Sequence, residues 1–151
     1  MINFKWFIPV VLICSFFILL LIFRSDLIDI ISRYQQNLLP ANEIETLETR
    51  LNQVYDYENN GKSFSYTLIE FGSTKCAACK NMELVLEKIR THFPDKVQVV
   101  FINVTDKSNK ELVTYFGISI IPAQVILNRK GNEVFRHTGY ISETELEKQF
   151  K

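Results

Sequence analysis

The chain has 151 residues, of which 47% are apolar and 23% charged, and this composition of a folded protein excludes general disorder. Its 17 basic and 17 acidic residues balance, and no basic run or aromatic–basic interleaving occurs. Nucleic acid is therefore not an expected partner. The three cysteines are Cys14 and the pair Cys76 and Cys79, too few for a disulfide framework or a four-cysteine zinc site.

The apolar run from Trp6 to Phe23 carries no charged side chain over about 18 residues. At about 1.5 Å per residue, this is near the lower limit for crossing a bilayer core of roughly 30 Å, and Trp6 suits an interfacial position. The terminal position of the run disfavours a buried core helix, and the lack of a small-x-small site disfavours a cleaved signal peptide. We therefore expect an uncleaved transmembrane anchor over residues 1–24, with Cys14 as a lipid-facing apolar residue.

The charges that flank this run do not decide its orientation in a membrane. Lys5 precedes the run, whereas Arg24 and Arg33 follow it, and the positive-inside rule counts only such basic residues. Because a short N-terminal tail usually stays in the cytoplasm, we favour an extracytoplasmic position for the rest of the chain.

Residues 25–40 are predicted to form a helical juxtamembrane spacer, because their apolar residues recur at helical spacing until Pro40. A dimerising or membrane-surface helix is the alternative for this segment. Residues 41–151 are predicted to form one globular domain. Its first helix is expected over 41–62, where Asn60 and Gly61 give an end signal.

The remaining elements alternate between strand and helix patterns. Strands are predicted over 64–73, 96–104, 123–128 and 132–139, and helices over 76–93, 109–117 and 143–150. Gly117 is a candidate C-terminal cap, and Ser142 with Glu145 forms a candidate capping box. This order predicts a sheet with a parallel part and a final antiparallel hairpin, with helices on its faces.

The motif Cys76-Ala-Ala-Cys79 is expected at the N-terminus of a helix. Its spacing allows the two sulfurs to form a disulfide. The first sulfur then lies beside unpaired backbone N–H groups and the positive end of the helix dipole, which lower a thiol pKa. Because only the thiolate attacks a disulfide, Cys76 is the predicted nucleophile and Cys79 the predicted resolving cysteine.

A strand that leads into Cys-x-x-Cys and a helix resembles the active site of the thioredoxin family, and the resemblance extends from about Phe64 to the end. Four features carry it in order: the motif "CAACK", Glu70 six residues before Cys76, the segment "GISIIPAQVILNRKGNEV", and Gly139 in "HTGY". The resemblance implies an α/β fold, with a thioredoxin-like mixed sheet flanked by helices. The transmembrane helix that the apolar run predicts precedes this fold at the N-terminus.

The same resemblance implies roles for individual residues. Pro122 is expected to be cis, and the backbone at Ile121 to pair with a substrate chain as an added strand. Glu70, if buried, is expected to have a raised pKa and to accept the proton of Cys79. The family more often has Asp there, so the reach of the longer Glu70 is open, and a solvated Glu70 at a strand edge is the alternative.

Lys75 stands where the family often has an aromatic residue, and we group it with the substrate-binding candidates. Its charge either favours the Cys76 thiolate or is only solvated. The two alanines between the cysteines provide neither proline nor histidine, so we expect a less acidic Cys76 than in strong oxidants. A reductant or an electron relay is the expected role.

Two other classes of function compete with this interpretation. The segment "TKCAACKNMELVLEKI" also resembles the copper-binding motif of heavy-metal-associated domains, in which thiolates hold a soft metal. Ser73 stands where that motif prefers methionine, and that fold has no use for the "IIPAQ" loop or the final hairpin. The third class is a tethered interaction module with inert cysteines.

The two histidines, His92 in an expected loop and His137 on the last strand, do not indicate a metal site.

We therefore expect a single-pass thiol–disulfide oxidoreductase of a bacterial cytoplasmic membrane, with its catalytic domain outside. Its expected partners are protein disulfides or dithiols, apocytochromes among them. The resemblance also implies a polytopic membrane electron carrier as donor. No metal or organic cofactor is expected, because the cysteine pair carries the electrons.

Overall fold

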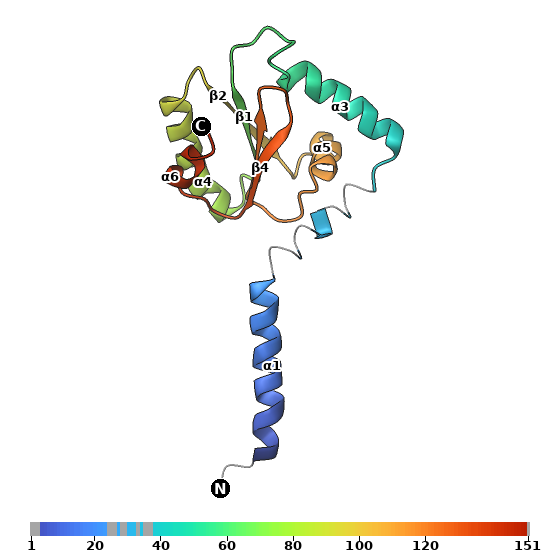
Figure 1. Cartoon of the computed structure of the whole chain (residues 1–151), viewed down its shortest axis with the longest axis vertical. Coiled ribbons are helices and arrows are strands. Elements are labelled where there is room, and N and C mark those ends of the chain that lie inside the picture. Colours follow the sequence, from blue (N-terminus) through green and yellow to red (C-terminus); the bar gives the residue numbers. More distant parts are fainter. Residues whose placement is uncertain (1–3, 24–26, 28–29, 33, 35–37, 151) are drawn as a thin grey trace.

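The computed structural model describes residues 4–23, 27, 30–32, 34 and 38–150, and within these ranges it describes side chains from residue 8 onward. The first helix, α1 (Phe4–Ile22), extends away from the rest of the molecule as a stalk (Figure 1). Within the described residues, no helix is long and apolar enough to cross a membrane. The transmembrane anchor over residues 1–24 is therefore not confirmed and stays a prediction.

Only part of the spacer predicted over residues 25–40 is among the described residues. Arg24, Arg33 and the side chains of Lys5 and Trp6 lie outside them. Its described residues are helical at 27, 30–32 and 34.

A four-stranded sheet forms the centre of the globular part, with strand order β2-β1-β3-β4. The strands are β1 (Tyr66–Gly72), β2 (Val97–Asn103), β3 (Ala123–Asn128) and β4 (Glu133–Thr138). β1 pairs in parallel with β2, whereas β1 with β3 and β3 with β4 are antiparallel pairs. This arrangement confirms the expected mixed sheet with a final hairpin.

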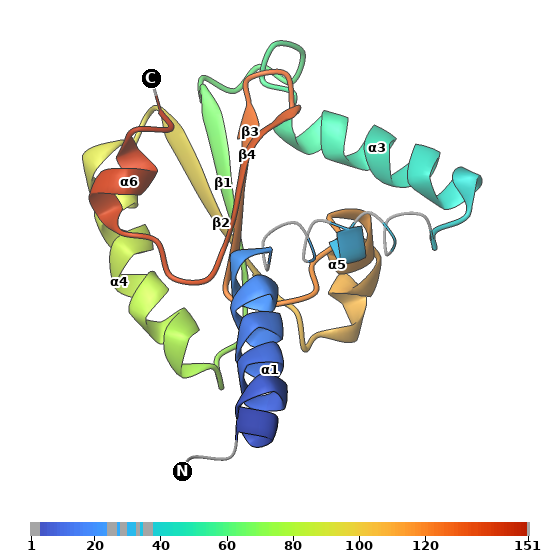
Figure 2. The same ribbon diagram turned by 60° about the horizontal axis from the view of Figure 1, so that its bottom comes forward.

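Helices cover both faces of the sheet (Figure 2). They are α3 (Ala41–Tyr55), α4 (Ala77–His92), α5 (Lys110–Tyr115) and α6 (Glu143–Glu147). Because side chains alternate between the faces of a strand, Leu68 and Ile126 pack with α4 and α6, while Ile69 and Val125 pack with α3 and α5. β1 is buried on both faces from Thr67 onward, as its apolar run predicts.

Helix α3 ends at Tyr55, whereas the sequence pattern extended the helix to residue 62. Asp56 forms an isolated bridge with Lys130, and the buried Tyr57 side chain shares a hydrogen bond with Thr67. These contacts with β1 and with the turn between β3 and β4 hold the chain outside the helix, so the prediction of its end was wrong.

The other helices agree with the sequence except at their ends. A short 3₁₀ helix (Lys107–Asn109) precedes α5, and Gly117 follows the C-cap of α5 with φ +61°. The capping box of Ser142 and Glu145 is present at the start of α6. Helix α6 ends at Glu147, earlier than the predicted residue 150.

Candidate active site

The cysteine pair lies where strand β1 passes into helix α4. Cys76 is the N-cap residue of α4, and Cys79 follows in its first turn. The register of β1 with β3 places Ala123, the residue after Pro122, opposite Phe71. The loop with Pro122 therefore lies at the same end of the two central strands as the cysteine pair. The Ile121–Pro122 bond is cis, as predicted.

The Cys76 sulfur is partly exposed and accepts a hydrogen bond from the backbone N–H of Cys79, at 3.2 Å. Hydrogen bonds from the Cys79 thiol, from the Cys79 backbone and from Ala78 lower the pKa of the Cys76 thiol, against a smaller opposing effect of burial. A thiol with a lowered pKa at the surface is suited to attack a disulfide.

The Cys79 thiol lies in the opposite environment, with a relative exposure of only 6%. Burial, the hydrogen bond to Cys76, and the charges of Cys76 and Glu70 raise the pKa of Cys79 to about 11. Both cysteines are free thiols in this structure. Cys79 therefore needs a proton acceptor before it can act as a nucleophile at neutral pH.

Glu70 is 1% exposed, so the alternative of a solvated carboxylate at a strand edge is wrong. Its burial raises the pKa of the carboxyl to about 7, while a hydrogen bond from Gln124 acts in the opposite direction. The negative charge of Glu70 raises the pKa of both thiols. Glu70 thus lies within electrostatic reach of the cysteines and can exchange a proton near neutral pH.

Gln124 on β3 was not among the residues that the sequence indicated. Its side chain is fully buried, and Nε2–H donates to Oε2 of Glu70 at 2.8 Å. The available signal was a lone amide within the apolar run "AQVILN". Its partner could not be identified without the register of β3 against β1.

A cavity of about 450 Å³ joins the buried acid to the second cysteine. Glu70, Cys79 and Phe101 are among its lining residues. Gly72 keeps this region compact, because a Cβ there would lie 2.9 Å from the Phe101 ring and 3.4 Å from the Cys79 sulfur. The Glu70 carboxyl and the Cys79 thiol therefore line one cavity next to a tightly packed strand.

The three substrate-binding candidates occupy different environments. Lys75 is exposed in the turn before Cys76, and its ammonium is not among the interactions that lower the Cys76 pKa. Ile121 is half-buried and Pro122 is buried. The carbonyl of Pro122 accepts a hydrogen bond from Gly139 N–H at 2.7 Å, which places this glycine beside the cis-proline loop.

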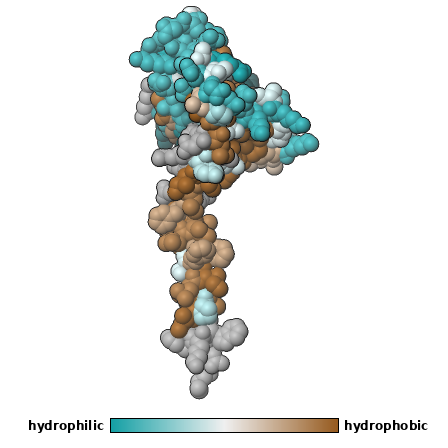
Figure 3. Space-filling model, turned by 90° about the vertical axis from the view of Figure 1, so that its right-hand side faces the viewer, coloured by the Kyte–Doolittle hydropathy of each residue, from teal (hydrophilic) through white to brown (hydrophobic). Residues whose placement is uncertain are grey.

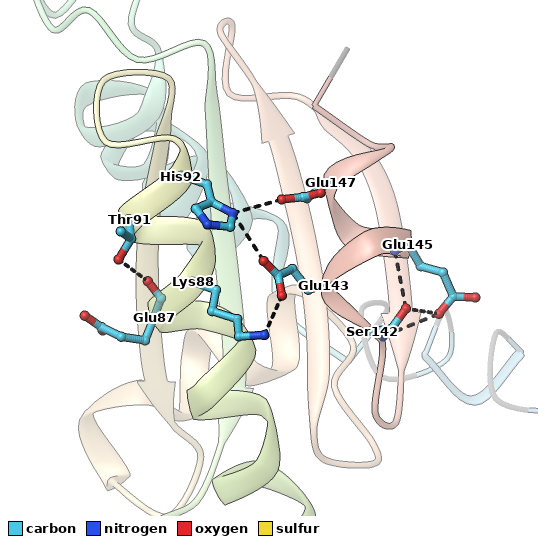
Figure 4. A network of polar contacts seen from close by, with 8 residues as sticks. All are labelled: Glu87, Lys88, Thr91, His92, Ser142, Glu143, Glu145 and Glu147. Atoms are coloured by element: carbon cyan, nitrogen blue, oxygen red, sulfur yellow. Dashed lines mark hydrogen bonds and ion pairs between the residues drawn. The ribbon is translucent and has the colours of Figure 1, made fainter.

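A second polar cluster joins the end of α4 to α6 (Figure 4). His92 ends α4 and is not in a loop, and its Nδ1 lies 3.2 Å from a carboxylate oxygen of Glu143 and of Glu147. Among the described residues, this trio has donor atoms close enough to hold a metal ion. Lys88 pairs with Glu143 at 2.7 Å, and these ion pairs account for the arrangement without a metal.

Helix α4 thus begins with a cysteine pair that has one partly exposed and one buried thiol, and a buried acid and a cis-proline loop belong to the neighbouring strands. The family model named Thioredoxin matches residues 50–151. The chain belongs to the thioredoxin family. Membership in this family indicates thiol–disulfide oxidoreductase chemistry in general terms.

Three relatives have similar segments. The chain is 33% identical over 75 residues to thioredoxin-like protein HCF164 of Arabidopsis thaliana chloroplasts, which covers 50% of this chain and 28% of that protein. It is 31% identical over 84 residues to thioredoxin-like protein slr0233 of Synechocystis, covering 56% and 77%. It is 36% identical over 81 residues to a putative thioredoxin 2 of Streptomyces coelicolor, covering 54% and 58%. The match therefore spans less than a third of the chloroplast relative.

Solved structures have the same fold. A Fasciola hepatica thioredoxin superposes with TM-score 0.52 at 24% identity, covering 61% of this chain and 83% of that one. Oxidised mitochondrial thioredoxin 3 of Saccharomyces cerevisiae gives TM-score 0.53 at 22% identity, covering 68% and 86%. At these identities the likeness establishes the fold alone.

Proposed function

We propose that the chain is a membrane-tethered thiol–disulfide oxidoreductase that reduces, or relays electrons to, disulfides of extracytoplasmic proteins. The observation that carries this proposal is the unequal pair of cysteines at the start of α4. Cys76 is accessible and has a lowered thiol pKa, whereas Cys79 is buried, with a thiol pKa raised to about 11, and shares a cavity with Glu70. This asymmetry suits one thiol to attack and the other to resolve.

The first step is the attack of the Cys76 thiolate on one sulfur of a target disulfide. The target S–S bond breaks, a mixed disulfide with Cys76 forms, and the other target sulfur leaves as a thiolate. The lowered pKa of Cys76 increases the fraction of its thiol that is present as the attacking thiolate. The backbone at Ile121, before Pro122, aligns the target chain as an added strand, and Lys75 lies at the exposed rim of the same site.

The second step releases the target. Cys79 gives its proton to Glu70, and its thiolate attacks the Cys76 sulfur of the mixed disulfide. The Cys76–Cys79 disulfide forms and the second target sulfur leaves as a thiolate, so two electrons have passed to the target. The protein ends oxidised, and a membrane-embedded dithiol donor is the proposed source of new electrons. The cysteine pair carries the electrons itself, without a metal or organic cofactor.

The proposed tether is residues 1–24, and the proposed compartment is the outer side of a bacterial cytoplasmic membrane. Support comes from the uncharged run in the sequence and from the apolar side chains of α1, which are largely exposed; Leu12, for example, is 62% exposed. In Figure 3 the visible face of the stalk is mainly hydrophobic, in contrast to the far end of the globular part. A helix with such a surface is suited to an apolar environment.

The test of the exchange reaction is to trap the mixed disulfide. With a disulfide-containing protein as target, Cys79→Ser is expected to accumulate a covalent complex through Cys76 that dithiothreitol releases. Cys76→Ser is the matched control and is expected to form none. A complex that forms equally in both variants, or in neither, contradicts the proposed roles.

A further inference from the structure

We propose that Gln124 is the positioning residue of Glu70: its amide holds the Glu70 carboxyl in place and pairs with it in both of its protonation states. This inference rests on the proposed thiol–disulfide exchange and specifies how its buried proton acceptor works.

The register makes Glu70 and Gln124 direct partners across the antiparallel pair of β1 and β3. Directly opposed residues present their side chains on the same face of a sheet. The row across the four strands is Phe101, Glu70, Gln124 and His137. Gln124 is therefore the cross-strand neighbour of Glu70 on the face that α4 covers, two residues after Pro122.

The hydrogen bond between the two side chains is fully buried. Gln124 is 0% and Glu70 is 1% exposed, and Gln124 Nε2–H donates to Glu70 Oε2 at 2.8 Å. An N–H donor stabilises the carboxylate form, because a buried charge without a donor is poorly solvated. The amide therefore provides the buried Glu70 carboxylate with a hydrogen-bond donor that favours its ionised form.

Each partner also has one buried oxygen without a hydrogen-bond donor in the described part of the chain: Glu70 Oε1 and Gln124 Oε1. Both are acceptors while Glu70 is ionised. A proton on Glu70 Oε1 would add an O–H donor, which the Gln124 carbonyl can accept. One proton then satisfies both oxygens and completes an acid–amide pair. An amide suits both states, because it offers a donor to the carboxylate and an acceptor to the acid.

Other titratable groups surround this pair. Cys79 from α4 lines the same cavity as Glu70, as do the charged residues Lys80, Glu83 and Arg90 of α4. From β4, His137 is the neighbour of Gln124 in the row, with its Nε2 3.2 Å from the Tyr140 carbonyl. A pH dependence assigned to Glu70 must therefore be separated from the titration of these groups by mutation.

In the proposed cycle, Glu70 receives the proton that Cys79 loses before Cys79 attacks the mixed disulfide. The hydrogen bond from Gln124 Nε2–H to Glu70 is kept. The new O–H group of Glu70 donates a hydrogen bond to the side-chain carbonyl of Gln124. When the pair Cys76–Cys79 is reduced again, Glu70 returns the proton to the Cys79 thiolate. Gln124 makes no contact with the reacting sulfurs in this scheme, and it acts only through Glu70.

The test uses the full chain in detergent with Cys14→Ser and an aromatic disulfide that releases a coloured thiolate. Attack by Cys76 releases the first thiolate, and resolution by Cys79 releases the second, so the two steps are measured separately. Gln124→Met keeps the side-chain length but removes donor and acceptor. The bond to the charged carboxylate is worth more than the bond to the neutral acid, so losing both is expected to raise the proton affinity of Glu70 roughly tenfold. The second release then slows about fivefold at pH 7 and less at higher pH.

Two control variants distinguish positioning from a general structural effect. Gln98→Met removes a half-buried amide of β2 that accepts a hydrogen bond from Tyr57, and it is expected to leave the pH profile of the second release unchanged. In a Glu70→Gln background, Gln124→Met is expected to slow the second release no further. Equal slowing with and without Glu70, or an unchanged profile in Gln124→Met, overturns the inference.

A measurement on the unmutated site needs neither turnover nor a stable variant. In NMR titrations, the Gln124 side-chain NH₂ resonances are expected to shift with the same midpoint as the Glu70 carboxyl carbon. Gln124 resonances that do not follow Glu70 would overturn the inference. If instead no thiolate is released by the unmutated cysteine pair, the proposed function fails, while the NMR result still decides the pairing.

Discussion

Cys76 and Cys79 are separated by two alanines, yet their thiols meet opposite conditions. The Cys76 sulfur is the N-cap of α4, so the unpaired N–H groups of the first turn can solvate a thiolate there. The Cys79 side chain points into the core, where a thiolate has little solvation. The difference arises from position on the helix and requires no special residue between the cysteines.

The buried carboxyl of Glu70 should make folding stability depend on pH. Its pKa is about 7 in the folded protein, against an ordinary value of 4.5. Between these values the unfolded chain loses the proton and the folded chain keeps it, so stability is expected to fall as pH rises through this window. The full difference is about 3 kcal/mol.

Glu70→Gln removes the titrating carboxyl and is expected to abolish this decrease of folding stability with pH. The variant should therefore be more stable than the parent at about pH 7.5 by up to about 3 kcal/mol. At about pH 4.5 the two should be nearly equal. Urea unfolding of the reduced proteins measures this, and Glu83→Gln, an exposed carboxyl at the same cavity, is the matched control. The same pH slope in Glu70→Gln as in the parent would show that Glu70 is not the group responsible.

At the scale of elements, Gly117 joins α5 to the segment that leads to the cis-proline loop. Its φ of +61° is in the left-handed region, and a Cβ there would lie 2.5 Å from the backbone oxygen of Ser32. Ser32 is only 8% exposed, so the segment after α1 packs against the domain here. Glycine is needed at this position for its backbone conformation and for this close approach.

Gly117→Ala is therefore expected to destabilise the fold by more than the roughly 1–2 kcal/mol that a left-handed conformation costs. Gly61→Ala is the matched control, because Gly61 has φ +79° and no atom within 4 Å of its added Cβ. The difference between the two losses, from urea unfolding, measures the contact with Ser32. Equal losses would show that this contact contributes nothing.

The elements themselves could largely be predicted from the sequence, because the strands and helices of this domain have strong periodic patterns and caps. What could not be predicted depends on contacts between distant segments. Helix α3 ends at Tyr55 because Asp56 and Tyr57 are held by the sheet. The pairing of Gln124 with Glu70 depends on strand register, which residue spacing within one strand does not define.

In the candidate site, too, features of local motifs could be predicted, whereas features that depend on distant contacts could not. Cys76, Cys79 and Pro122 belong to local motifs, and their places on the α4 N-terminus and in a cis loop agree with the sequence. The sequence was compatible with a buried Glu70 and with a solvated Glu70 at a strand edge. The fold shows that Glu70 is buried.

For the molecule as a whole, the proposed tether is the apolar stalk of α1. If residues 1–24 span a membrane, the full chain is expected to stay with membranes during alkaline carbonate extraction. Substituting Leu12→Arg together with Ile18→Arg places two charges within the run and is expected to release it. Thr105→Arg, in an exposed loop of the domain, is the control. Extraction of the unmutated chain would contradict the tether.

The proposed exchange requires that Cys76 and Cys79 form a reversible redox couple, and the reduction potential of the full chain measures this. The measurement equilibrates the Cys14→Ser protein in glutathione or dithiothreitol buffers, with Cys76→Ser and Cys79→Ser as controls. We predict a reversible two-electron couple near the thioredoxin value of about −270 mV, which is the potential of a reductant. The absence of a reversible couple, with copper(I) bound tightly by both thiolates, would contradict the account and indicate a metal-binding protein instead.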